Sequence, residues 1–212
     1  MDFDKIDLDS WARKEHYIHF LHEVECSYSV TLNLDISPLK GERLYPAMLW
    51  LLAGTVNALP EFRTALRADG PGVYRTMHPA YTIFNPDRKI FTSVWTPYQK
   101  DYRAFLKAYL DDTAVYGRST HYISKPDRPG NSFDVSMVPW LHFTSFNLNI
   151  HSGGSYLLPI FTMGRFEEKE GKRLLPLAIQ VHHAVCDGYH VGQFAALLQE
   201  DIFRFPGEGP WE

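Results

Sequence analysis

The spacing of apolar residues along the chain predicts several helices. Asp9 and Ser10 are candidate N-caps of the first helix, and apolar side chains follow them at roughly helical spacing: Trp11, Tyr17, Phe20 and Leu21. Residues 45–59 are apolar on all sides, which predicts a buried helix. Amphipathic patterns predict further helices over residues 101–116 and 190–205.

Other stretches have the two-residue period of a half-buried strand. Alternation is clearest at Tyr28, Val30, Leu32, Leu34 and Ile36. Residues 80–95 predict two strands around a turn at 85–88. Further strands are expected over residues 141–151, 156–166 and 173–183, the last after the charged turn at 167–172. Helices mixed with antiparallel strand pairs predict an α/β or α+β fold around a mixed sheet. No linker or repeat divides the chain, so we expect residues 1–212 to form a single domain.

Composition narrows the class of protein. Hydrophobic residues make up 45% of the 212 positions and aromatic residues 15%, enough for a sizeable core. The formal net charge is -4 and there is no Lys/Arg run, which argues against a nucleic-acid partner. The longest apolar run, residues 47–56, falls short of the ~20 residues that a membrane span needs. The acidic N-terminus lacks the basic region of a signal peptide, and Cys26 and Cys186 form no disulfide framework. We therefore expect a cytoplasmic protein.

The densest cluster of reactive side chains is QVHHAVCDGYHVGQF, residues 180–194. It lies where a predicted strand enters an Asp-Gly turn and then a helix, a junction that exposes side chains at the end of a sheet. Three kinds of chemistry fit its residues: a metal site, a thiolate nucleophile, or a general base.

The pattern favours the general base. Neighbouring strand residues point to opposite faces, so His182 and His183 cannot chelate one ion, and His183 with Asp187 alone supplies too few ligands. Cys186 sits among apolar residues without an activating cation, which favours packing over nucleophilic attack. A second histidine set, at positions 16, 19 and 22 of the first helix, has chelating spacing, although a solvated or packing role is favoured there. A neutral imidazole can take a proton from a hydroxyl and return it to a leaving group.

The motif HHAVCDG also resembles the HHxxxDG signature of chloramphenicol acetyltransferases and of the acyltransferase cores of 2-oxoacid dehydrogenase complexes. Further segments resemble the chloramphenicol acetyltransferases in the same order along the chain: WARKEHY, YPAMLWLLAGTVN, SMVPWLHFTSFNLNI, PIFTMGR and LLPLAIQVHHAVCDG. No lipoyl-like domain or Ala/Pro linker precedes them, which favours this branch. The resemblance implies a two-layer α/β sandwich with helices packed on one side of a mixed sheet.

The resemblance implies roles for individual residues. His183 matches the general base, and Asp187 matches a structural aspartate paired with Arg13. Ser136 matches the serine whose hydroxyl stabilises the oxyanion. Trp140 and Arg165 match positions along the coenzyme A passage. The matches to the acceptor pocket are Phe20, Tyr28, Leu148 and Thr162.

Two positions depart from the family pattern. Asp134 is asparagine in some relatives, and its added negative charge is expected to weaken contact with an anionic coenzyme. Phe20 stands where others have a tyrosine, so one polar contact to the acceptor is expected to be missing.

The implied activity is acetyl transfer from acetyl-CoA to the 3-hydroxyl of chloramphenicol, which inactivates the antibiotic. The resemblance also implies a homotrimer with active sites at the subunit interfaces, and no metal. Two alternatives stay open: a CoA-dependent acyltransferase with another hydroxyl acceptor, and a catalytically silent ligand-binding relative. The second is disfavoured because His183, Asp187, Arg13 and Ser136 are all present.

Overall fold

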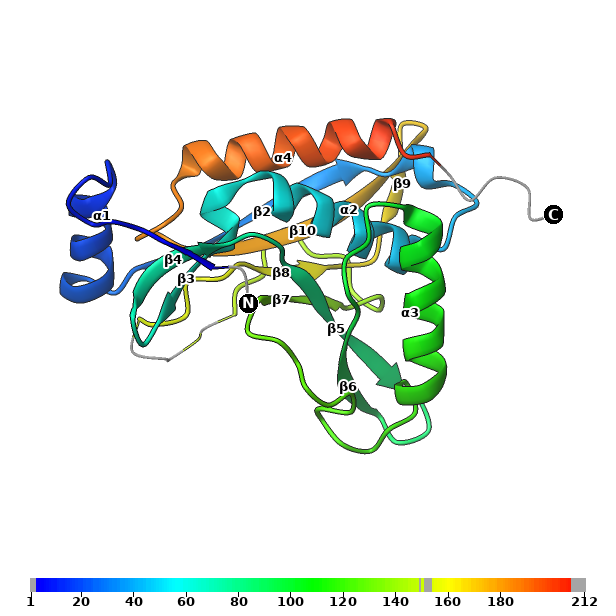
Figure 1. Cartoon of the computed structure of the whole chain (residues 1–212). Helices are drawn as coiled ribbons and strands as arrows, with labels where there is room; N and C mark the ends of the chain where they lie inside the picture. Colours follow the sequence, from blue (N-terminus) through cyan, green and yellow to red (C-terminus); the bar gives the residue numbers. More distant parts are fainter. Residues whose placement is uncertain (1–2, 149, 151–153, 207–212) are drawn as a thin grey trace.

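One large mixed sheet forms the centre of the protein. A computed structural model describes residues 3–148, 150 and 154–206 (Figure 1). The sheet has seven strands, in the order β2-β10-β8-β7-β5-β6 with β9 beside β10. Their bounds are β2 Ser27–Asp35, β5 His78–Asn85, β6 Ile90–Trp95, β7 Ser132–Met137, β8 Ile160–Met163, β9 Glu167–Lys169 and β10 Lys172–His182. β7 pairs in parallel with both β5 and β8, and the remaining pairs are antiparallel.

A smaller antiparallel sheet, which the sequence pattern did not predict, lies beside the large one. It has the order β1-β4-β3, with bounds β1 Phe3–Lys5, β3 Thr64–Arg67 and β4 Gly70–Tyr74. Its strands are three to five residues long, too short for alternation to distinguish them from turns.

Most of the helices gather on one face of the large sheet, as predicted, whereas the first stands beyond the end of the sheet (Figure 1). Their bounds are α1 Lys14–Ile18, α2 Leu44–Ala58, α3 Tyr102–Tyr116 and α4 Gly188–Phe203. Figure 1 shows α4 lying along β2 and β10 with α2 beside it, while α3 stands at the β6 end. The α/β class with a mixed sheet is therefore confirmed. None of the helices in the described part of the chain is long and apolar enough to cross a bilayer.

Alternate residues of each strand point to opposite faces of the sheet. One face packs against the helices and forms the core, and the other is called the second face below. Phe161 of β8 stacks on Phe194 of α4 at 5.2 Å between ring centroids, and Tyr81 of β5 meets Tyr109 of α3 at the same distance. α2 is buried on most sides, as its unbroken apolar pattern predicted. The neighbouring strand positions, such as Ser136 on β7, point to the opposite face of the sheet.

The predicted start of the first helix is wrong. α1 begins at Lys14, four residues later than Ser10, and its N-cap position is Arg13. Asp9 and Ser10 belong to a turn instead, because the Asp7 carboxylate accepts hydrogen bonds from the Asp9 amide at 3.1 Å and from the Ser10 hydroxyl at 2.7 Å. This side-chain turn competes with helix formation, as is common for short polar residues.

The strand predicted over residues 141–151 is also wrong for its described part, because residues 141–148 form no strand; residues 149 and 151 lie outside the described chain. Two of its backbone amides bond to side chains of the sheet: Phe146 N to Thr31 Oγ1 at 3.3 Å and Leu148 N to Gln180 Oε1 at 3.2 Å. The segment therefore lies against the second face of the sheet. It comes so close to Gly164 that a Cβ there would stand 2.8 Å from the Leu141 carbonyl oxygen.

The strand predicted over residues 156–166 is present but shorter. β8 covers only Ile160–Met163, bounded by Pro159 and Gly164. The charged turn after it is a tight hairpin, in which Glu170 and Gly171 both have positive φ. Two positive-φ residues are the requirement of the two-residue turn that fits the twist of paired strands.

Candidate active site at the end of strand β10

The histidine pair lies where β10 ends. His182 pairs with Ser27 as the last residue of the strand, and the His183 amide donates to the Cys26 carbonyl at 2.8 Å. The His182 side chain is buried, its Nδ1 accepts from the Ala184 amide at 3.2 Å, and burial lowers its pKa. His182 is therefore a packed, neutral residue, and His183 is the one left to face a substrate.

The imidazole of His183 is held between aromatic rings. Phe20 stacks on it with ring centroids 3.9 Å apart and an interplanar angle of 10°, and Tyr28 meets it edge-on at 5.3 Å. Phe20 belongs to a π-helical turn, His19–Glu23, that continues α1. Such turns are often found at functional sites. Phe20 thus contacts the candidate base itself, a contact that sequence spacing did not reveal.

Arg13 and Asp187 form the second support of this site. Arg13 Nη1 donates to Asp187 Oδ2 at 2.6 Å and Nη2 donates to Oδ1 at 2.7 Å, a bidentate pair. Nη2 also donates to the His183 carbonyl at 3.1 Å. The hydrogen bonds from Arg13 lower the pKa of the Asp187 carboxyl, so this group is ionised at neutral pH. The pairing is the one that the family resemblance implies.

The position of Asp187 also indicates which ring nitrogen of His183 carries the lone pair. Its Nδ1 is buried and lies 3.4 Å from Asp187 Oδ1, without hydrogen-bond alignment. The nearby negative charge favours a proton on Nδ1, which leaves the lone pair on Nε2. Since the side chain is 31% exposed, Nε2 is the nitrogen available to a substrate hydroxyl.

His190 is a member of this network that the sequence analysis missed. Its Nδ1 accepts from the Asp187 amide at 3.0 Å, and its Nε2 lies 3.7 Å from Glu61 Oε1. Asp187 is the N-cap of α4 and His190 is the third residue of that helix. A polar side chain at this spacing from an N-cap was the signal that could have found it.

The structure argues against a thiolate nucleophile at this motif. Cys186 is only 1% exposed, and burial raises the pKa of its thiol to about 12, so thiolate is scarce at neutral pH. Cys26 and Cys186 are both free. His19 pairs with Glu23 at 2.7 Å on the exposed side of its turn. Within the described ranges, no group of three or more His, Cys, Asp or Glu side chains is arranged to hold a metal ion.

Ser136 lies on the second face of the sheet, away from His183. Its hydroxyl oxygen is 3.0 Å from Thr162 Oγ1 on the neighbouring strand. Ser136 is in register with Thr162, and Thr162 with Ala178 of β10. His183 is five residues beyond Ala178 and two strands across, about 19 Å from Ser136 at ordinary strand spacings. A single copy of the chain does not bring the two side chains to one reacting group.

Trp140 and Arg165, the candidate coenzyme A residues, come from neighbouring exposed segments. The Arg165 amide donates to the Leu141 carbonyl at 2.7 Å, next to Trp140. The indole of Trp140 is 55% exposed and meets Phe84 edge-on at 4.7 Å. An exposed indole and an exposed guanidinium on neighbouring segments suit an adenine-containing, phosphorylated ligand.

The four candidate acceptor residues are divided between two places. Phe20 and Tyr28 contact His183, as described above. Tyr28 and Leu148 line a cleft of about 190 Å³ along the edge of β2 and β10. Leu148 and Thr162 line a shallower depression beside it, and Gln180 borders both. Tyr28 therefore belongs to both places, because it contacts His183 and also lines the cleft.

The charge of Asp134 is compensated. Its Oδ1 lies 2.8 Å from Arg128 Nη1, and its Oδ2 accepts from the Tyr156 hydroxyl at 2.7 Å. The expected repulsion of an anionic coenzyme is correspondingly reduced, because a paired carboxylate presents little net charge.

Comparisons with known proteins point to one family. The family model described as chloramphenicol acetyltransferase matches residues 1–199. A chloramphenicol acetyltransferase of Clostridium perfringens is 50% identical over 205 residues, covering 95% of this chain and 99% of that protein. One from Vibrio anguillarum is 45% identical and covers 99% and 98% of the two chains.

Solved structures show the same fold at lower identity. A chloramphenicol acetyltransferase structure superposes with a TM-score of 0.87 at 22% identity, covering 94% of this chain and 99% of that one. The dihydrolipoamide acetyltransferase of Azotobacter vinelandii has a TM-score of 0.66 at 18% identity, covering 89% and 85%.

Proposed function

Because the chain belongs to the chloramphenicol acetyltransferase family, we propose that it transfers the acetyl group of acetyl-CoA to the 3-hydroxyl of chloramphenicol and so inactivates the antibiotic. The observation that carries the proposal is the His183 imidazole, stacked on Phe20 with Nδ1 facing Asp187 and Nε2 left for a substrate. This is the arrangement that a general base requires.

The reaction needs one base and one oxyanion donor. His183 Nε2 takes the proton of the 3-hydroxyl as its oxygen attacks the thioester carbonyl. The resulting oxyanion accepts a hydrogen bond from Ser136, which is free to donate when Thr162 donates to Ser136. The carbon–sulfur bond then breaks, and the imidazolium returns its proton to the thiolate of coenzyme A. The products are the acetylated drug and free thiol, without an acyl-enzyme.

The remaining candidate residues bind the two substrates. Phe20, Tyr28, Leu148 and Thr162 form the acceptor pocket, and its aromatic and apolar surface suits a nitrophenyl ring. Trp140 and Arg165 line the coenzyme A passage. We also propose that the protein is cytoplasmic and that residues 1–212 form a single domain.

The active sites lie between subunits of a homotrimer. The separation of about 19 Å between His183 and Ser136 supports this arrangement, since base and oxyanion donor must both reach one substrate. Exposed apolar residues on the sheet edge and the neighbouring loops give a second copy a surface to cover, among them Phe84, Phe91, Trp140, Leu141 and Leu148.

The activity is tested by measuring thiol release from acetyl-CoA with chloramphenicol, and with the analogue that has fluorine in place of the 3-hydroxyl. We expect release with the drug only, and competitive inhibition by the analogue, which offers no proton to His183. No release with chloramphenicol would refute the acceptor. Release with the fluorinated analogue would refute the 3-hydroxyl as the attacking group.

The shared site is tested by subunit complementation. His183→Ala and Ser136→Ala chains, each nearly inactive alone, are co-refolded in equal amounts. A mixed trimer contains one interface with an intact His183 and an intact Ser136, so about a quarter of the wild-type rate should return. No recovery from a mixture shown to contain mixed trimers would place both residues in one subunit's site.

A further inference from the structure

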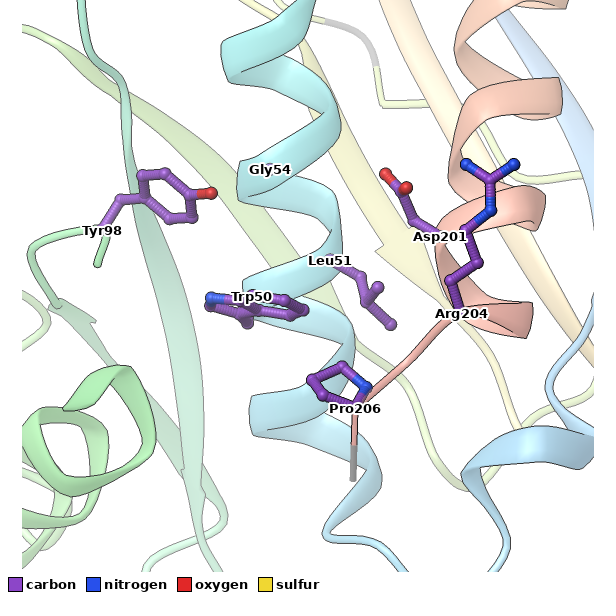
Figure 2. Close-up of a pocket in the computed structure, with 7 residues that line it drawn as sticks. All are labelled: Trp50, Leu51, Gly54, Tyr98, Asp201, Arg204 and Pro206. Carbon is purple, nitrogen blue, oxygen red and sulfur yellow. The ribbon is translucent and has the colours of Figure 1, made fainter. Parts of the chain in front are cut away.

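A second cleft lies at the far end of α4. It has a volume of about 270 Å³ and opens between α2, α4 and the segment after β6 (Figure 2). Its lining residues are Trp50, Leu51, Gly54, Tyr98, Asp201, Arg204 and Pro206. Asp201 is fourteen residues after Asp187 on one helix, so the cleft is about 21 Å from the candidate active site. The proposed reaction does not use it.

Asp201 is the chemically distinctive residue of this cleft. Its carboxylate forms no hydrogen bond or ion pair with any residue between 3 and 206 that the structure describes. Burial raises the pKa of its carboxyl, against a smaller opposing effect of Arg204. Arg204 itself is exposed and lies 3.3 Å from Glu200. A partly desolvated carboxylate that forms no direct ion pair is unfavourable, and a ligand that supplies positive charge would relieve it.

The opposite wall of the cleft is aromatic and rigid. In Figure 2, Trp50 and Tyr98 lie on one side and Asp201 and Arg204 on the other. Trp50 Nε1 donates to the Gln99 carbonyl at 2.9 Å, and the indole packs on Tyr102 at 5.4 Å. The Tyr98 amide donates to His78 Nδ1 at 3.0 Å. These contacts fix the wall before any ligand arrives.

We propose that this cleft binds a small organic cation, an ammonium or amidinium group on a compact apolar body. The cation pairs with Asp201, and the rings of Trp50 and Tyr98 attract the same charge and cover the apolar part. The volume is close to the lower limit of small-molecule pockets, about 300 Å³, which restricts the ligand to small molecules. An anion is disfavoured by the Asp201 carboxylate.

The probe is benzylamine, compared with benzyl alcohol and benzoate, which have the same ring with neutral and negative head groups. Binding is followed by NMR on the indole N–H signal of Trp50, which reports on the cleft and not on His183. We expect saturable binding of benzylamine and at least about tenfold weaker binding of the other two, which corresponds to ~1.4 kcal/mol. Equal affinities for benzylamine and benzyl alcohol would overturn the proposal.

Two pairs of variants locate the binding. Asp201→Asn should weaken benzylamine at least about tenfold, whereas Asp69→Asn removes an equal charge from the β3–β4 turn and should not. Gly54→Leu should fill the cleft, whereas Gly54→Ala adds only a Cβ at an ordinary 3.5 Å from the Tyr98 hydroxyl and should keep affinity. Unchanged affinity in a folded Asp201→Asn protein would refute the site. The acetyl-transfer assay is independent, so failure of either proposal leaves the other to its own test.

Discussion

The two ends of helix α4 each hold an aspartate, and the two carboxylates have opposite surroundings. Asp187 at the N-terminal end receives two hydrogen bonds from Arg13 and has a lowered pKa. Asp201 in the last turn faces a cleft, has no such partner among the described residues, and has a raised pKa. The helix dipole adds to the contrast, since it favours negative charge at the first turn and disfavours it at the last.

This difference shows how one residue type serves two purposes. The Asp187 carboxylate is occupied by its two hydrogen bonds from Arg13, and Arg13 in turn donates to the His183 carbonyl, so Asp187 helps to hold the His183 backbone through Arg13. A carboxylate without hydrogen-bond partners can still accept hydrogen bonds from a ligand, and this is the case for Asp201. The hydrogen bonds that each carboxylate already accepts therefore distinguish Asp187, the proposed positioning residue, from Asp201, the proposed ligand-binding residue.

The largest expected difference between the two ends of α4 is in turnover. His183→Ala should lower kcat by about 10²–10⁴-fold, because one side chain serves as both base and acid. Glu200→Gln, at the distal end of the same helix, should stay within about twofold of the wild type. Steady-state kinetics with chloramphenicol and acetyl-CoA measure both. A His183→Ala protein within tenfold of the parent would mean that another group is the base.

The second largest expected difference is in the free energy of unfolding after each aspartate is replaced by asparagine. Breaking a buried ion pair costs roughly 3–5 kcal/mol, and the partial exposure of Asp187 reduces the expectation for Asp187→Asn to about 2–3 kcal/mol. Asp201→Asn should change the free energy of unfolding by no more than about 0.5 kcal/mol. Urea denaturation at neutral pH measures both. If Asp187→Asn lost turnover with no loss of stability, Asp187 would act in the chemistry directly.

The smallest effect concerns the pH dependence of stability. The pKa of Asp187 is lowered on folding, so its charge stabilises the protein above the unfolded pKa, and this stability is lost as the pH drops through the folded pKa. The pKa of Asp201 is raised, so its charge destabilises the folded protein as the pH rises. Relative to the wild type, Asp187→Asn should therefore lose less stability between about pH 5 and pH 2. Asp201→Asn should gain relative stability as the pH rises from about 3 to 6. Parallel curves for the two variants would contradict the opposite shifts.

Some of the fold could be predicted because its signals are local. The apolar pattern of α2, the amphipathic pattern of α4 and the alternation of β2 each lie within one element, and all three elements are present. The prediction of a strand over residues 141–151 was wrong because alternation indicates only which side chains could lie on one face. Whether a strand forms depends on a partner for its backbone, and residues 141–148 bond instead to side chains of β2 and β10.

The candidate site divides in the same way. Residue types and their local order were enough to predict the chemistry of residues 182–190, the strand–turn–helix junction that exposes it, and the family. The family resemblance already implied the pairing of Arg13 with Asp187. The stacking of Phe20 on His183, the separation of about 19 Å between Ser136 and His183, and the position of Asp201 at a cleft became visible only in the folded chain. Such pairings depend on how finished elements pack, and packing minimises the free energy of the whole chain at once, so no single stretch of sequence encodes them.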